Sequence, residues 1–258
     1  TEIRLHDMTG FDGRCDALLF TRVGAPETAD IQKFRKTKYD SIDKNYDLVV
    51  AGGGIAGMCA AAAAARNGLK VALVNDRPVL GGNNSSEIRV HLGGYVEMEP
   101  YKGLGRMIRE FGHTEKGNAR PAESYQDWKK QEFIDAEENI DLYAPYHVIA
   151  VDAKASEIES VTAVHIETGE KVRLCGRLFA DCTGDGTVGF LAGADWTMGR
   201  ESRDEYGERS APVKADDMVM GASVQWYSRK CPQKTVFPEF SYGVEFNASN
   251  CERVTMGE

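Results

Sequence analysis

The sequence lacks the features that mark several common classes of protein. Its six cysteines form no C-x-x-C pair and show no zinc spacing, so we expect no iron–sulfur cluster and no other metal site. Its longest strongly apolar run covers residues 58–65, far short of the roughly 20 residues that a membrane span needs. Positive charge is also scarce, with 31 basic against 40 acidic residues, which argues against general attraction to nucleic acid or anionic membranes.

The N-terminus lacks the pattern of an export signal, because the first 20 residues contain no basic segment followed by an apolar one. The chain nevertheless starts at Thr1, so a removed signal and a shortened N-terminus are both open explanations. We expect a cytoplasmic protein by default and a periplasmic or secreted one if a signal was removed. The 258 residues, 42% of them hydrophobic, suffice for one large domain or two small ones.

The most informative stretch lies between residues 46 and 75. It contains an apolar run at 48–51, a glycine-rich sequence at 52–57, an alanine-rich segment at 60–65 and a second apolar run at 70–75. Two apolar runs suited to burial on both faces, separated by a helix-forming segment, are typical of parallel strands joined by a helix. The stretch therefore predicts a strand, a tight turn, a helix and a second strand parallel to the first.

Three glycines of this stretch, Gly52, Gly54 and Gly57, have the G-x-G-x-x-G spacing of a dinucleotide-binding turn. The first allows a sharp exit from the strand, the second lets a pyrophosphate approach the backbone, and the third lets the helix pack closely on the sheet. A ribose-binding acid is expected at the end of the second strand, where Asn75 is followed by Asp76. Either Asp76 or the amide of Asn75 could hold the ribose hydroxyls.

The segment after the second strand combines backbone freedom with polar side chains. Gly81 and Gly82 precede four small polar residues at 83–86, and this favours a loop that contacts a ligand over a plain surface loop. His91 follows in the same segment. It could face a redox centre and move protons there, although a lone histidine more often has a structural role.

The rest of the chain predicts further helices, a hairpin and a strand that ends near the ligand. The elements are helices at 103–111 and 124–139, one strand or two short ones at 141–151, a hairpin of strands at 161–166 and 171–174, a strand at 177–182, and a further strand at 218–226. The strand at 177–182 ends in small residues at the sheet edge where ligands bind. Asp185 there could bond a cofactor hydroxyl, cap a helix at 187–192, or do both.

The order of these signals resembles that of the FAD-dependent oxidoreductases of the glutathione-reductase-like superfamily. The resemblance rests on the glycine-rich turn at 52–57, the R-P-V-L-G-G loop at 77–82 and the A-D-C-T-G-D-G strand end at 180–186. Residues 76–94 and 7–21 are the most specific, and they resemble a bacterial group some of whose members are labelled xanthan lyases. The likeness extends over nearly the whole chain.

This resemblance implies an FAD site. The glycines of the turn would contact the pyrophosphate, the end of the second strand the ribose, the backbone of a later strand the adenine, and the following loop and the T-G-D motif the phosphates, the flavin or its neighbouring hydroxyls. The pyrophosphate residues are Gly52, Gly54 and Gly57, the ribose residues are Asn75, Asp76 and Arg77, and the adenine residue is Val148. The residues of the following loop are Gly82, Asn83 and Ser86, and those of the T-G-D motif are Thr183, Gly184 and Asp185. At position 75 many members of the superfamily have glutamate, so the ribose contact departs from the pattern.

We therefore predict an α/β fold: a Rossmann-like FAD-binding domain with a parallel sheet, a β-hairpin layer and helical insertions. An arm would cover residues 1–45, the FAD domain 46–192, and the start of a substrate domain 193–258. The resemblance also implies a closing strand and helix near the C-terminus, and nothing after Trp226 has that glycine-rich form. Because family members are also much longer, we expect the domain to be incomplete at its C-terminus and the sequence to be the N-terminal portion of a larger enzyme.

The function implied is an FAD-dependent oxidoreductase that transfers a hydride between flavin N5 and a small organic substrate, with carbohydrate-derived compounds among the candidates. Three alternatives stand beside it: an NAD-binding dehydrogenase, a polysaccharide lyase, and a non-catalytic flavin-binding partner subunit. The T-G-D strand end argues against the first, and the lack of a recognisable lyase groove argues against the second. The substrate, the electron acceptor and the oligomeric state are left open.

Overall fold

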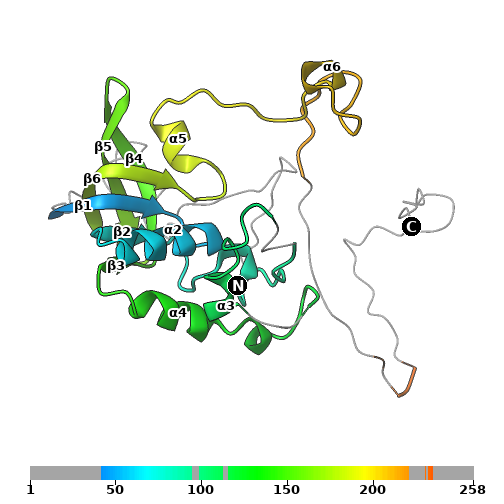
Figure 1. Cartoon of the computed structure of the whole chain (residues 1–258), viewed down its shortest axis with the longest axis horizontal. Helices are drawn as coiled ribbons and strands as arrows, with labels where there is room; N and C mark the ends of the chain where they lie inside the picture. Colours follow the sequence, from blue (N-terminus) through cyan, green and yellow to red (C-terminus); the bar gives the residue numbers. More distant parts are fainter. Residues whose placement is uncertain (1–41, 95–98, 113–115, 221–229, 231, 235–258) are drawn as a thin grey trace, which may run out of the picture.

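Figure 1 shows the computed structural model of the chain, which describes residues 42–94, 99–112, 116–220, 230 and 232–234. A six-stranded sheet with the order β3-β2-β1-β6-β5-β4 forms its centre. The strands are β1 (Ile42–Ala51), β2 (Val71–Val74), β3 (Ile140–Tyr143), β4 (Tyr146–Lys154), β5 (Glu157–His165) and β6 (Lys171–Asp181). The helices are α2 (Ile55–Arg66), α3 (Ile108–Phe111), α4 (Asp127–Asp135), α5 (Thr187–Leu191) and α6 (Arg203–Tyr206), with 3₁₀ turns η1 (Gly82–Asn84) and η2 (Ala122–Tyr125).

The sheet has a parallel part and an antiparallel part. β1 pairs in parallel with β2 on one side and with β6 on the other, and β2 pairs in parallel with β3. β4, β5 and β6 form an antiparallel meander. The predicted α/β fold with a parallel sheet and a hairpin layer is therefore confirmed.

The elements differ from the sequence prediction mainly in length. The strands predicted at 171–174 and 177–182 form one continuous strand, β6. Gly176 lies between them and lets the strand pass close to β1, since a Cβ at this position would lie only 3.0 Å from a methyl group of Val49. Of the two alternatives for 141–151, the pair of strands is correct, and the chain enters the second strand, β4, after Pro145. Of the strand predicted at 218–226, residues 218–220 form none and the rest lie outside the described residues.

The two predicted insertion helices are shorter than expected. The helix at 103–111 is reduced to α3, and the residues before it form turns, because Gly103 and Gly105 disfavour a helix. The helix at 124–139 is reduced to α4, which follows η2 after Gln126, a residue with a left-handed backbone (φ 48°). The predicted arm at 1–45 lies outside the described residues, except that β1 already begins at Ile42.

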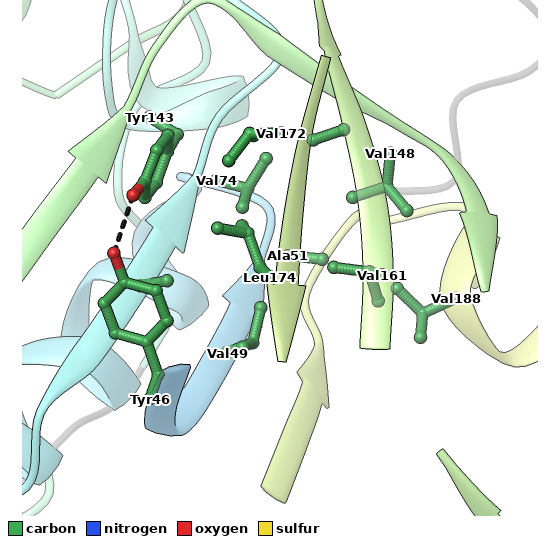
Figure 2. Close-up of a cluster of buried hydrophobic side chains, with 12 residues drawn as sticks. Tyr46, Val49, Ala51, Val74, Tyr143, Val148, Val161, Val172, Leu174 and Val188 are labelled. Atoms are coloured by element: carbon green, nitrogen blue, oxygen red, sulfur yellow. Dashed lines mark hydrogen bonds between the residues drawn. The ribbon is translucent and has the colours of Figure 1, made fainter. Parts of the chain in front are cut away.

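Apolar side chains cover both faces of the parallel strands. Val49 belongs to the core that β4, β5 and α5 cover, part of which Figure 2 shows, together with the hydrogen bond of 2.6 Å between the hydroxyls of Tyr46 and Tyr143. Val50 points to the opposite face and belongs to the core formed with α2, α3 and α4. Because successive residues of a strand alternate between faces, this double burial explains the continuous apolar runs in the sequence.

Helix α2 packs on the sheet through small residues. Ala61, Ala62 and Ala65 are buried against the strands. A Cβ on Gly57 would overlap the carbonyl oxygen of Gly52, so the first turn of α2 lies directly against the end of β1. The helix begins at the carboxyl edge of the sheet, and this position fixes where its N-terminal N–H groups lie.

We predict that Gly57→Ala destabilises the protein by about 1–3 kcal/mol, because the added methyl group must push α2 away from the sheet. The matched control is Gly54→Ala at the start of the same helix, where a Cβ would contact only the Cα of Gly82 at 3.9 Å. We expect this control to cost less than about 1 kcal/mol. Chemical denaturation of the two variants measures both values, and equal stability of the two would contradict the packing argument.

Candidate functional site

Two adjoining cavities lie at the carboxyl ends of the parallel strands, and both are lined by Gly52, Asp76 and Thr183. The first has a volume of about 310 Å³ and is also lined by Val74, Tyr146, His147, Val148, Asp185 and Thr187. The second has a volume of about 370 Å³ and extends along the start of α2, residues 81–84, residues 90–93 and Gly184. Together they form an elongated cleft at the sheet edge where α/β proteins bind ligands.

The glycine-rich turn is shaped by close backbone contacts. Gly52 has a φ of +107°, and a Cβ on it would overlap the carbonyl group of Cys182 at the end of β6. Gly54 is the N-cap of α2. The first turn of this helix contains no acidic residue, and no side chain caps it. The positive end of the helix dipole and the free N–H groups therefore face the second cavity, an arrangement that suits an anion.

Two of the predicted contact residues lie away from the surface of the cleft. Gly57 is buried beneath Gly52 and lines neither cavity, because its position serves the packing of α2 on the sheet. Ser86 also lines neither cavity, and its N–H donates a hydrogen bond to the carboxylate of Asp127, 3.2 Å from each oxygen. The other predicted residues, from Gly52 to Asp185, line one or both cavities.

The buried side chain of Asn75 connects the glycine-rich turn to the loop that follows β2 through hydrogen bonds. Its Oδ1 accepts a hydrogen bond from the N–H of Gly53 at 3.2 Å, and its Nδ2 donates to the carbonyl oxygens of Arg77 (2.7 Å) and Val79 (3.0 Å). A Cβ on Gly53 would lie 2.6 Å from the Asn75 side chain, so the middle glycine of the turn is required by this contact. Both hydrogens of the amide bind within the protein, which leaves Asp76 as the better candidate for the ribose.

Asp76 is exposed in the first cavity and lies beside a histidine that the sequence analysis missed. Its Oδ2 is 3.6 Å from Nδ1 of His147. The close approach of His147 lowers the pKa of Asp76 below its usual value, and the charge of Arg77 acts in the same direction. The carboxylate is therefore ionised at neutral pH and is a hydrogen-bond acceptor for hydroxyl groups.

The end of β6 excludes one of the two roles considered for Asp185, the capping of α5. The N-cap of α5 is Gly186, so Asp185 does not cap this helix. Instead, Thr183 Oγ1 accepts from the N–H of Thr187 (3.0 Å), and Asp181 Oδ2 accepts from the N–H of Gly189 (2.9 Å). Burial alone would raise the pKa of Asp181, but the N–H of Gly189 and the Thr183 hydroxyl outweigh burial and lower it. Asp185 is left exposed at the first cavity.

His91 lines the second cavity and is oriented by Asn118, a residue that no sequence signal marked. The N–H of His91 and its Nδ1 both lie within hydrogen-bonding distance of Asn118 Oδ1, at 3.0 and 2.6 Å. Because an amide oxygen only accepts, Nδ1 carries the hydrogen in this pair. In the neutral imidazole, Nε2 is then the nitrogen that can accept a proton.

The comparison with protein families decides the identity of the fold. The family model described as FAD dependent oxidoreductase matches residues 47–252. The chain belongs to this family. The family makes FAD the cofactor, in agreement with the resemblance noted in the sequence. A search of the curated proteins found no match.

Several solved structures are similar to this chain at low identity. A geranylgeranyl bacteriochlorophyll reductase-like protein from Thermoplasma acidophilum is 19% identical, over 60% of this chain and 43% of its own, with a TM-score of 0.38. Anhydrotetracycline hydroxylase from Streptomyces rimosus is 19% identical over 62% and 36%, with a TM-score of 0.43. Adenylylsulfate reductase from Archaeoglobus fulgidus is 16% identical over 57% and 31%, with a TM-score of 0.40. The chain thus spans less than half of the length of each.

The geometry of the cleft fits FAD. The cleft is elongated, as a dinucleotide requires, and its middle is lined by backbone rather than side chains, with Gly54 and Gly82 facing each other. The carboxylates of Asp76 and Asp185 line the first cavity, and the uncapped start of α2 lines the second. Among the described residues, no group of acidic, histidine and cysteine side chains could hold a metal ion, and no helix is long and apolar enough to cross a bilayer.

We predict that Asn75→Asp destabilises the protein by about 2–4 kcal/mol, because a buried carboxylate would face the carbonyl oxygens of Arg77 and Val79 in place of a donor. The matched control is Asn83→Asp, the same change at an exposed position of the cleft. Chemical denaturation at neutral pH measures both. If Asn75→Asp lowers the free energy of unfolding no more than the control does, the role of Asn75 in connecting the two loops is contradicted.

Proposed function

We propose that the cleft binds FAD along its length. The first cavity takes the adenosine, with the buried strand residue Val148 beside the adenine and Asp76 at the ribose hydroxyls. The start of α2 and the glycines around it take the pyrophosphate. The loop with Gly82 and Asn83, together with Gly184, borders the part of the cofactor beyond the phosphates.

The binding of the pyrophosphate is supported by the electrostatics of the turn. Gly54 and Gly82 leave the N-terminal N–H groups of α2 accessible, and no acidic side chain in the first turn repels an anion. A helix N-terminus carries roughly half a positive charge, which favours a phosphate in contact with it. Arg77 also lines this cavity, where its ion pair with Glu87 (3.3 Å) partly balances its charge.

We propose further that the protein is an FAD-dependent oxidoreductase acting on a small organic, carbohydrate-derived substrate. Membership in the FAD dependent oxidoreductase family is the observation that carries this proposal, and it favours FAD over NAD. When bound, FAD supplies hydride transfer to or from its N5 atom. The role of His91 is to accept or deliver a proton at Nε2, with Asn118 holding the ring.

Residues 46–192 would form the FAD domain and 193–258 the start of a substrate domain, after an arm at 1–45.

The activity is tested by anaerobic mixing of the FAD-loaded full-length protein with a panel of sugars, sugar acids and other small alcohols and amines. We expect at least one compound to bleach the flavin absorbance faster than the buffer alone. A flavin that dithionite reduces but that no compound in the panel reduces would favour the non-catalytic flavin-binding subunit instead.

We predict that Asp76→Asn weakens FAD binding by about 10- to 150-fold, because a charge-assisted hydrogen bond to a hydroxyl contributes about 1.5–3 kcal/mol. The binding of FMN, which has no adenosine, should not change. The control is Asp135→Asn, which removes an exposed carboxylate that lines neither cavity. Flavin fluorescence titrations measure the affinities. Equal weakening of FAD and FMN, or an unchanged affinity for FAD, would contradict the ribose role.

We predict that His91→Gln lowers the rate of substrate-driven flavin reduction by about 10²–10⁴-fold, because the proton acceptor at the second cavity is lost. FAD affinity should change only a few-fold. Asn118→Ala should lower the same rate less, and change its pH profile, since the ring of His91 loses its orientation. His165→Gln is the control, because His165 lines neither cavity. A rate unchanged by His91→Gln would remove His91 from the chemistry.

A further inference from the structure

Lys130 of α4 is fully buried, which is unusual for a lysine. Its Nζ donates a hydrogen bond to the carbonyl oxygen of Tyr125 at 2.6 Å and lies 3.4 Å from Oδ1 of Asp127. Burial lowers the pKa of Lys130, and the charge of Asp127 opposes this effect. A buried ammonium group is expensive, and an apolar side chain of similar length would fill the same space at less cost. The position therefore calls for an explanation in terms of what Lys130 contacts.

The alkyl chain of Lys130 lies against the loop that forms one wall of the second cavity, which we call the glycine loop (residues 81–86). A Cβ on Gly81 would lie 2.7 Å from Cδ and 2.8 Å from Cε of Lys130. Gly81 has a φ of +109°, a left-handed conformation that favours glycine. Lys130 thus packs against the glycine loop from the side opposite to the second cavity.

Asp127 connects the same lysine to the other end of the glycine loop. Its two carboxylate oxygens each lie 3.2 Å from the N–H of Ser86, and Oδ1 also faces Lys130 Nζ. On the opposite side, the N–H of Gly81 donates to the carbonyl oxygen of Gly53 at 2.9 Å. The glycine loop is therefore held between the glycine-rich turn and the Lys130–Asp127 pair of α4.

We propose that Lys130 and Asp127 are positioning residues that hold the glycine loop in the shape that completes the second cavity. An apolar residue at 130 would fill the space behind Gly81, but it would remove the ammonium group that donates to the Tyr125 carbonyl oxygen and faces the Asp127 carboxylate. The pair thereby sets how tightly the protein holds the part of FAD beyond the adenosine. This inference rests on the proposed binding of FAD in the cleft.

The first experiment compares the Lys130→Met and Lys129→Met variants of the full-length protein. Both remove one lysine charge from α4, but Lys129 is only partly buried and its Nζ lies over the ring of Trp128. We expect Lys130→Met to weaken FAD binding by about tenfold or more, and Lys129→Met to change it less than about twofold. Adenosine, which the proposed function places in the first cavity, should bind the wild type and both variants equally.

A second experiment needs no cofactor. Hydrogen exchange of the ligand-free protein should show faster exchange of the Ser86 amide and of the peptide covering residues 82–91 in Lys130→Met than in the wild type or Lys129→Met. Asp127→Asn, the second variant, should accelerate the same amides if Lys130→Met does not fold. Unchanged exchange in the folded variants would overturn the inference.

The two readouts separate this inference from the proposed function. If the wild type does not bind FAD, the proposed function fails, and hydrogen exchange still decides whether the pair holds the loop. If the binding of FAD and that of adenosine are weakened alike by Lys130→Met, or if Lys129→Met weakens FAD binding as much, the pair does not act through the second cavity and the inference is overturned.

Discussion

The structure depends on a place where three backbone segments meet without side chains between them. The end of β1, the start of α2 and the end of β6 approach so closely that a Cβ on Gly52 would overlap Cys182 and one on Gly57 would overlap Gly52. This contact brings the helix N-terminus to the carboxyl edge of the parallel strands. The cleft exists because the glycines allow the contact, and the contact places the uncapped start of α2 at the second cavity.

Hydrogen bonds from supporting side chains hold the loops around the cleft in place. Asn75 ties the glycine-rich turn to the loop that follows β2, and Asp127 and Lys130 tie the glycine loop to α4. These side chains are buried or partly buried and lie behind the surface that a cofactor would contact. The surface itself is formed by glycine backbone, by Asp76 and by His91, whose ring Asn118 orients.

The sequence predicted the features that local patterns encode. The apolar runs of β1 and β2, the glycine spacing and the alanine-rich helix depend on neighbouring residues, and all are present in the structure. It could not predict contacts between distant residues. Asn118 orients His91 from 27 positions away, and Lys130 lies behind Gly81 although no pattern links them. Asn75 was considered as a ribose ligand because only its position, and not its three hydrogen bonds, is visible in the sequence.

The most direct test of this account is the visible absorption spectrum of the purified full-length protein, with the released chromophore identified by mass. We expect a band near ~450 nm and release of FAD, since an oxidised flavin absorbs there and the family uses FAD. A colourless protein that remains colourless after incubation with FAD and removal of the excess would contradict the assignment of the cleft as a flavin site.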